Sequence, residues 1–190
     1  RAVGYHAPGV TINRYCASGL EAIAMATAKI RMGMAECIIA GGTESMSLVP
    51  TAGWKTVPAY SIASDEPDYY LSMGLTAEAV AKEYQVNRED QDEFSFRSHQ
   101  KAMNAIQQGY FKPGILPITV EEIYLDEKMK KQKRSYVVDT DEGVRADTTV
   151  QALAKLKPAF AMGGSVTAGN SSRTSDGSAF VMVMSERMVN

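Results

Sequence analysis

The sequence predicts an α/β fold in which a core formed by the two ends of the chain is interrupted by an inserted, mostly helical subdomain. Residues 9–16 show an alternating pattern with β-branched and aromatic side chains, which is typical of a strand. The Ala-rich residues 17–32 carry apolar side chains at helical spacing. Residues 36–40 are almost wholly apolar and end at two glycines, which is typical of a strand buried on both faces. This strand–helix–strand order is that of a βαβ unit.

The domain organisation follows from changes in composition along the chain. Residues 1–48 and 162–190 are rich in small and apolar side chains and are predicted to form the core. Residues 49–161 are more charged and are predicted to form the insert. Near the end of the chain we expect a flexible polar loop at 163–172, followed by a helix that passes into a strand at 179–184.

Two helices and a basic segment are predicted within the insert. Thr76 is placed to cap the first helix, and Asn87 is placed to cap a second, longer helix that Gly109 should end. Residues 126–134 hold five basic side chains, for which a solvated loop is favoured over a binding patch.

Composition excludes several classes of protein. The 190 residues are 45% hydrophobic and 22% charged, which is ordinary for a globular protein and argues against disorder. A formal charge of −2 gives no drive toward nucleic acid, and no apolar run approaches the roughly 20 residues that span a bilayer. Two cysteines do not build a disulfide framework, so a reducing, cytoplasmic compartment is favoured. Because the chain begins at Arg1, we expect a piece of a longer protein.

Cys16 is the sharpest candidate for chemistry. It lies where the predicted strand ends and the helix begins, so the helix dipole and free N–H groups would favour its thiolate, the nucleophilic form. The alternative is a small buried residue, and spacing alone favours that alternative. Cys37, within an apolar strand, is predicted to be inert core. Neither His6 nor His99 is placed as a base for the thiol, and no cluster has the spacing of metal ligands.

Several segments resemble the thiolase family, in order and over nearly the whole chain. The nucleophile segment of thiolases is similar to residues 13–23, and the family's next strand and turn are similar to residues 40–47. The other similar segments are 73–78, 88–92, 156–160, 167–172 and 175–177. The resemblance implies a thiolase-like N-terminal domain, with a mixed sheet and a buried helix, interrupted by a loop domain that binds coenzyme A.

The resemblance also implies a reaction. In thiolases the matching cysteine attacks the keto carbon of a 3-ketoacyl-CoA, the Cα–Cβ bond breaks and acetyl-CoA leaves. The acyl chain stays on sulfur until a second CoA thiol accepts it. Cys16 would be this nucleophile, and its backbone N–H would be a donor to the oxyanion. Coenzyme A is then a substrate, and no cofactor and no metal are implied.

Five further positions match binding residues of the family. Ser172 matches a serine that contacts the pantetheine arm, and Arg145 matches a basic residue near the nucleotide end of coenzyme A. Met73, Ala168 and Phe160 match residues that line the acyl and pantetheine channel. Without the resemblance, these side chains would be interpreted as loop caps, surface charge and core packing.

Two departures from the family pattern bear on function. The Gly-His-Pro segment of thiolases and their second cysteine, in a Cys-x-Gly-Gly-Gly segment, are absent, so the chain resembles a partial thiolase expected to be inactive by itself. Ser72 stands where short-chain biosynthetic thiolases carry His, which favours a 3-ketoacyl-CoA thiolase of fatty-acid β-oxidation. The alternatives are an acetoacetyl-CoA thiolase, a condensing enzyme acting on carrier-protein thioesters, and a truncated, non-catalytic protein that binds coenzyme A.

Partners and location follow from the resemblance alone. Thiolases associate through the core sheet domain, which implies a homodimer or a homotetramer, with a β-oxidation multienzyme complex as a further partner. In a eukaryote the compartment would be mitochondrial or peroxisomal. An isolated piece should expose a sheet edge and helix faces, and should therefore self-associate.

Overall fold

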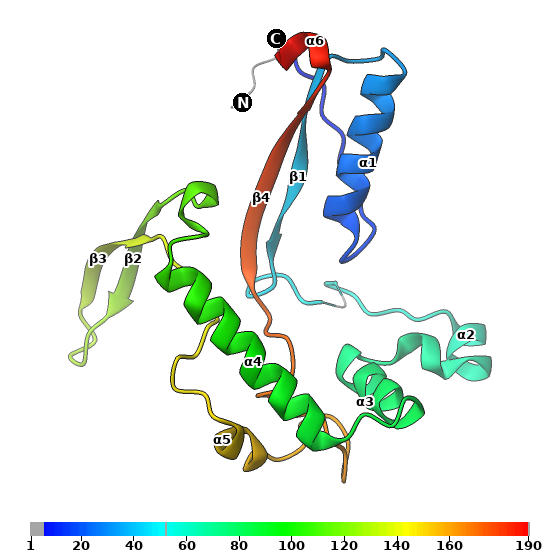
Figure 1. Ribbon diagram of the computed structural model, residues 1–190, viewed down its shortest axis with the longest axis vertical. Helices are drawn as coiled ribbons and strands as arrows, with labels where there is room; N and C mark the ends of the chain where they lie inside the picture. Colours follow the sequence, from blue (N-terminus) through cyan, green and yellow to red (C-terminus); the bar gives the residue numbers. More distant parts are fainter. Residues whose placement is uncertain (1–5, 52, 190) are drawn as a thin grey trace. The chain divides into compact units, whose positions relative to one another are not determined.

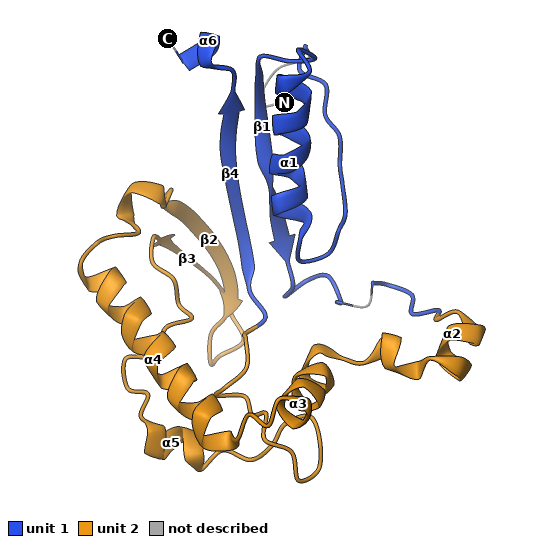
Figure 2. Cartoon of the chain, turned by 45° about the vertical axis from the view of Figure 1, so that its right-hand side comes forward, with its two compact units in different colours: residues 1–57, 174–190 blue, residues 58–173 orange. Residues whose placement is uncertain are grey.

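The computed structural model describes residues 6–51 and 53–189, and it separates into two compact units. One unit comprises residues 1–57 and 174–190, and the other comprises residues 58–173 (Figure 2). The predicted domain boundaries, 1–48 and 162–190 against 49–161, stay a prediction, because compact units do not by themselves define domains. Within the described ranges, no helix is both long and apolar enough to cross a bilayer.

The first unit pairs two antiparallel strands and packs a helix beside them (Figure 1). Its elements are α1 (Ser18–Arg31), β1 (Cys37–Ser45), β4 (Asp176–Met184) and α6 (Glu186–Val189). The two strands pair along their whole length, and a Cβ on Gly41 of β1 would overlap the backbone of β4. Ala26 of α1 and Ala40 of β1 are buried, so small side chains let the helix approach the sheet.

Three sequence predictions for this unit are wrong. Residues 9–13 lie in no strand, and only an isolated bridge between Arg14 and Cys16 remains of the expected strand at 9–16. The partner of β1 is antiparallel, so the expected parallel βαβ unit does not form among the described residues. Residues 179–184 lie wholly within β4, with no helix before it. Side-chain alternation indicates extended backbone, but it does not specify the neighbouring strand that makes a sheet.

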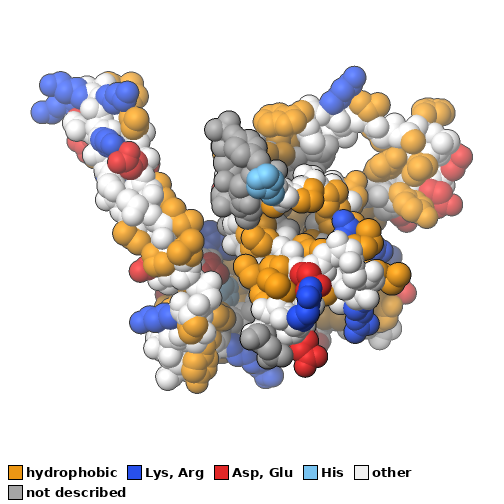
Figure 3. Space-filling view, turned by 90° about the horizontal axis from the view of Figure 1, so that it is seen from above, with side chains coloured by type: hydrophobic (Ala, Val, Ile, Leu, Met, Phe, Trp, Pro, Cys, Tyr) orange, Lys and Arg blue, Asp and Glu red, His pale blue; other side chains and the backbone are white. Residues whose placement is uncertain are grey.

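β1 is also less buried than its apolar sequence predicts. Ala40 is its only buried residue, Ile39 is 49% exposed, and Phe180 on the paired strand is 58% exposed. Hydrophobic side chains are exposed over much of the face shown in Figure 3. Cys37 is likewise exposed, so its predicted place in an inert core is wrong for this chain. One helix and one paired strand cannot cover both faces of such a strand.

The second unit is mostly helical and contains a β-hairpin. Its elements are α2 (Tyr60–Asp65), η1 (Pro67–Tyr70), α3 (Met73–Glu83), α4 (Arg88–Gln107), η2 (Lys112–Gly114), β2 (Ile118–Leu125), β3 (Lys131–Val138) and α5 (Val150–Ala154). Asn87 caps α4 as predicted, since its Oδ1 accepts a hydrogen bond from the backbone N–H of Asp90 at 2.8 Å. Gly109, with φ +71°, follows the end of that helix.

The cap of α3 differs from the prediction. The helix begins at Met73, and the Ser72 hydroxyl accepts from the backbone N–H of Leu75 at 3.3 Å. Thr76, the predicted cap, lies inside the helix and donates from its hydroxyl to the Ser72 carbonyl at 3.1 Å. Both residues are good caps, and Ser72 adds a full turn to the helix.

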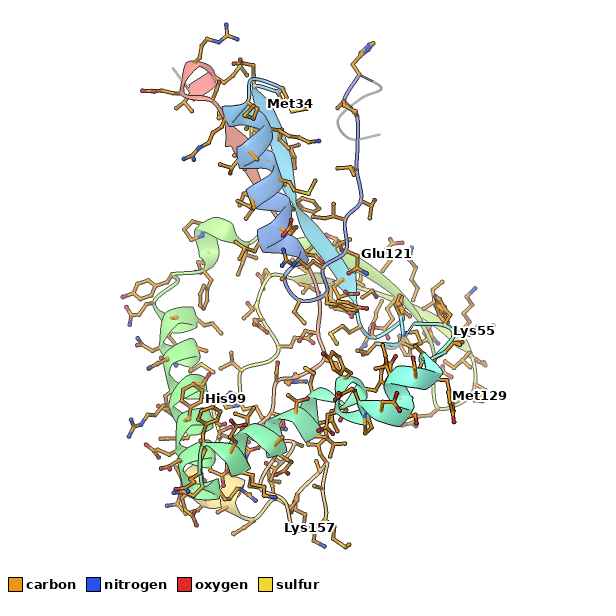
Figure 4. The ribbon with its side chains drawn as sticks, turned by 90° about the vertical axis from the view of Figure 1, so that its right-hand side faces the viewer. Met34, Lys55, His99, Glu121, Met129 and Lys157 are labelled. Atoms are coloured by element: carbon orange, nitrogen blue, oxygen red, sulfur yellow. The ribbon has the colours of Figure 1, made fainter. Side chains whose placement is uncertain are left out.

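The basic segment 126–134 is not a loop throughout. β2 and β3 form an antiparallel hairpin, and Met129, with φ +58°, lies in its turn (Figure 4). Lys133 pairs with Glu121 at 2.8 Å, and Arg134 pairs with Glu122 at 2.7 Å. Residues 131–134 of the segment are therefore strand, and two of its basic side chains pair with acidic ones across the hairpin.

Candidate active site

Cys16 lies in a tight turn immediately before α1. The side chain of Asn13 accepts from the backbone N–H of Tyr15 at 2.9 Å. The Ser18 hydroxyl accepts from the backbone N–H of Arg14 at 2.7 Å and donates to the Tyr15 carbonyl at 2.7 Å. Tyr15 itself has φ +49°, a left-handed conformation that is rare for a bulky side chain and that reverses the chain here.

The turn exposes the Cys16 thiol. The interpretation of Cys16 as a buried, inert residue is therefore wrong, and its catalytic role stays a prediction. The backbone N–H of Ala17 donates to Arg14 at 3.1 Å, and that of Ser18 donates to Tyr15 at 3.0 Å. Both donors are used inside the turn, so fewer N–H groups are free to face an oxyanion than the sequence suggested.

The segment at 163–172 was expected to be a flexible loop, but its residues 165–171, here called the 165–171 loop, are held by a dense hydrogen-bond network. The Asn170 side-chain amide donates to Asp92 on α4 at 3.0 Å and to the Ser165 carbonyl at 3.2 Å. Its Oδ1 accepts from the backbone N–H of Thr167 at 2.7 Å. Thr167 is 0% exposed and Asp92 is 2% exposed, so this network lies inside the unit. Such long-range bonds left no signal in the local sequence.

Arg88 compensates the buried charge of Asp92. Its Nε donates to the other carboxylate oxygen of Asp92 at 2.7 Å. Its Nη2 donates to the carbonyls of Leu153 at 2.7 Å and Leu156 at 3.0 Å, which joins α4 to the end of α5. A buried carboxylate needs such a partner, because desolvation alone would make its ionised form very unfavourable. The i,i+4 spacing of Arg88 and Asp92 was a readable signal that the sequence prediction missed.

Glu78 of α3 holds the same loop through its backbone. Its carboxylate accepts from the N–H of Ser165, at 3.0 and 3.1 Å, and from the N–H of Val166 at 2.9 Å. Partial burial by itself would raise the pKa of Glu78, but the hydrogen bonds from Ser165 and Val166 outweigh it and lower that pKa below its usual value. The ionised carboxylate is therefore the form that the loop favours.

Four of the predicted coenzyme A positions lie at or near this loop. Ala168 is exposed within the loop, and Ser172 is exposed just after it. Met73 opens α3 and shares an open, mostly apolar cavity of about 390 Å³ with Val166 and Asn170 of the loop. The Phe160 ring lies so close to α3 that a Cβ on residue 74 would overlap it. Their roles in binding stay predictions.

Arg145, the fifth predicted position, lies in the same unit, and the hydrogen bond that holds its backbone does not involve the 165–171 loop. Its side chain is exposed, and its backbone N–H donates at 3.2 Å to Nδ1 of His99. His99 is a residue of α4 (Figure 4). The sequence left His99 as a surface or packing residue, and the structure makes it an acceptor that fixes the backbone at Arg145. Since Nδ1 accepts here, Nε2 is the ring nitrogen that is left to donate.

Comparisons with known proteins agree with this architecture. Residues 2–187 match the family described as "Thiolase, N-terminal domain". A 3-ketoacyl-CoA thiolase of Bacillus subtilis is 52% identical over 95% of this chain and 46% of the relative. An acetyl-CoA acetyltransferase of Pseudomonas aeruginosa is 43% identical over 94% of this chain and 46% of the relative. The crystal structure of the dimeric peroxisomal thiolase of Saccharomyces cerevisiae aligns with TM-score 0.81 and 33% identity, over 96% of this chain and 44% of that one.

The fold and these matches define an α/β domain of the thiolase type. The chain belongs to the thiolase family, as the resemblance of its motifs predicted, and it corresponds to the N-terminal domain of that family. It spans about half the length of the curated relatives that it matches.

Proposed function

We propose that this chain supplies the nucleophile and a coenzyme A-binding surface of a thiolase, an enzyme that transfers an acyl group between a cysteine and coenzyme A. The observation that carries the proposal is the exposed thiol of Cys16, presented by a tight turn before α1 in a chain that belongs to this family. An exposed thiolate beside a helix N-terminus is a suitable nucleophile for a carbonyl carbon.

The proposed reaction has two steps. The Cys16 thiolate attacks the keto carbon of a 3-ketoacyl-CoA, the bond between that carbon and the α-carbon breaks, and the α-carbon takes a proton to give acetyl-CoA. The thiolate of a second coenzyme A then attacks the acyl-Cys16 thioester and releases the Cys16 thiolate with a shortened acyl-CoA. Negative charge develops on oxygen in both steps, and the donor that the family resemblance assigns to it is the backbone N–H of Cys16 itself. The complete reaction also needs a base and an acid, which in thiolases come from the Gly-His-Pro and second-cysteine segments.

A degradative role in fatty-acid β-oxidation is the substrate class that we favour. Ser72 supports it, because biosynthetic thiolases resemble one another in carrying His at this position. The Ser72 hydroxyl also caps α3, which gives the residue a local structural use that a His side chain does not readily supply. A biosynthetic acetoacetyl-CoA thiolase is the second candidate, since relatives and solved structures named acetyl-CoA acetyltransferase match as well. Rates with 3-ketoacyl-CoA substrates of increasing chain length would separate them: activity confined to acetoacetyl-CoA would overturn the degradative role.

Mass spectrometry tests the nucleophile directly. The protein, at the length that its gene encodes, is mixed briefly with acetyl-CoA, and its intact mass and peptide masses are measured. We expect one acetyl group on Cys16, no adduct in Cys16→Ser, and an unchanged adduct in Cys37→Ser. The Cys37→Ser control matters because both thiols are exposed. No adduct, on a protein whose mass equals the 20.6 kDa of this chain, would favour the non-catalytic alternative.

Assembly and location are proposed on the family alone. We favour a homodimer or homotetramer, to which a β-oxidation multienzyme partner could bind, in the cytoplasm of a bacterium or in a mitochondrion or peroxisome of a eukaryote. The solved neighbour described as dimeric supports self-association. Light scattering at the native length would give the mass of the assembly, and a monodisperse monomer would contradict this proposal.

A further inference from the structure

The two least exposed residues of the described chain are polar. Thr167 lies at 0% exposure and Asp92 at 2%, below each of the buried apolar residues. Asn170 connects them, because its amide donates to Asp92 at 3.0 Å and its oxygen accepts from the Thr167 N–H at 2.7 Å. The most protected position in the second unit is therefore occupied by a hydrogen-bond network.

Stability alone is a weak reason for this network. A buried ion pair such as Arg88 with Asp92 loses as much by desolvation as it gains by attraction, and apolar residues of the same volume often stabilise a protein as well or better. What a polar network adds is a defined geometry, because each donor must meet its acceptor at a particular distance and angle. Its value lies in the conformation that it fixes.

The conformation fixed here is that of the 165–171 loop. Asn170, held by Asp92, bonds to backbone atoms of Ser165 and Thr167. The Thr167 hydroxyl in turn accepts from the N–H of Gly169 at 3.2 Å and of Asn170 at 3.3 Å. Ala168 lies between these bonded residues, so its backbone is held on both sides while its side chain stays exposed.

We propose that Asp92 is a positioning residue for coenzyme A: acting through Asn170, it holds the 165–171 loop in the conformation that presents Ala168 and Ser172 to the pantetheine arm. This inference rests on the proposed function. Asp92 is buried on α4, so it would act through Asn170 rather than by touching the ligand. Arg88 orients the carboxylate by donating to it, and Glu78 holds the beginning of the loop from α3.

The test compares Asp92→Asn with Glu93→Gln in the protein at its native length. In Asp92→Asn, the new amide can keep its oxygen toward Arg88 only by turning its NH₂ toward the NH₂ of Asn170. The hydrogen bond between residues 92 and 170 is then lost. Glu93 pairs with Arg97 at 2.7 Å on the same helix with the same i,i+4 spacing, but on an exposed face. It is therefore a control for removing a charge and an ion pair without touching the loop.

Titration calorimetry with coenzyme A and quench-flow acetylation of Cys16 by acetyl-CoA are the measurements. We expect the Kd of Asp92→Asn to rise about tenfold, the order of a lost hydrogen bond to a charged group, and that of Glu93→Gln to stay unchanged. The acetylation rate at saturating acetyl-CoA should stay within about twofold, because the nucleophile is untouched. A merely structural role would lower the melting temperature and the folded fraction without changing the Kd of the folded molecules.

If Asp92→Asn does not fold, Asn170→Ser removes the link to Asp92 from the loop side, together with the bonds to Ser165 and Thr167, and the expected loss of affinity is at least as large. An unchanged Kd in the folded variant would overturn the inference and leave the proposed function standing. A wild-type protein that neither binds coenzyme A nor acetylates Cys16 would overturn both.

Discussion

The turn that carries Cys16 and the loop that carries Ala168 are both short segments outside helices and strands, but they are held in different ways. The Cys16 turn is closed by hydrogen bonds among residues 13–18, all of them local. The 165–171 loop depends on Glu78 and Asp92, which lie on helices far away in the sequence. The comparison teaches that the proposed nucleophile is set by local sequence, whereas the proposed binding loop is set by tertiary structure.

Removing the nucleophile should give the largest effect. Cys16→Ser leaves the turn intact, because the thiol makes none of the hydrogen bonds that close it. We expect acyl transfer to fall by on the order of 10³-fold or more, since a serine hydroxyl is far less nucleophilic than a thiolate near neutral pH. Steady-state assay of the native-length protein measures this, with Cys37→Ser as the control. A comparable loss of acyl transfer in both variants would mean that Cys16 is not distinguished from Cys37 as the nucleophile.

Breaking the buried ion pair should give the largest effect on stability. Arg88→Met strands the carboxylate of Asp92, which is 2% exposed, and we expect the free energy of unfolding to fall by about 3 kcal/mol. Arg97→Met breaks an exposed pair at the same spacing on the same helix and should cost less than about 0.5 kcal/mol. Urea unfolding monitored by circular dichroism measures both. Equal losses would mean that burial does not distinguish the two pairs.

Loosening the Cys16 turn should give an intermediate effect. Ser18→Ala removes the hydroxyl that accepts from Arg14 and donates to Tyr15, and we expect a loss of about 1 kcal/mol in stability. Acylation of Cys16 should slow severalfold, because the thiol is no longer held in one position. Ser98→Ala, at an exposed position of α4, is the matched control. An unchanged acylation rate in Ser18→Ala would show that the turn does not depend on this hydroxyl.

Acidification should give the smallest effect, and it should be confined to the 165–171 loop. The hydrogen bonds from Ser165 and Val166 hold the pKa of Glu78 in the folded protein below its ordinary value of 4.5, so the unfolded chain binds more protons in this range. The contribution of Glu78 is therefore present above pH 4.5 and is lost as the pH falls through the lowered folded pKa. Amide exchange at Ser165 and Val166, corrected for its intrinsic pH dependence, should rise in this window. Glu78→Gln should remove the pH dependence, and a wild-type profile in that variant would contradict the assignment.

The sequence predicted the local parts of the structure well. The Ala-rich helix at 17–32 appears as α1, Asn87 caps α4, and the motif resemblance identified the family. Each of these depends on residues within a few positions of one another. The turn at Cys16 is also local, since Asn13 and Ser18 lie beside it, but the sequence analysis expected the end of a strand there and did not predict it.

The non-local parts could not be predicted. The pairing of β1 with β4 joins distant segments, and nothing in residues 36–40 specifies that partner. The loop at 163–172 was expected to be flexible because small and polar residues dominate it, but the carboxylates that hold it lie on α3 and α4. Burial was overestimated at Cys37 for the same reason, because an apolar strand is buried only where other segments cover it.

The pairing of β1 with β4 has a consequence for the order of folding. The second unit is one continuous segment, 58–173, whereas the sheet of the first unit needs residues from both sides of that segment. During synthesis, β1 leaves the ribosome long before its partner strand exists. The helical unit can therefore fold on the nascent chain first, and the sheet must wait until residue 184 has emerged. Until then β1 has an unpaired edge, and unpaired strand edges of this kind are prone to aggregation.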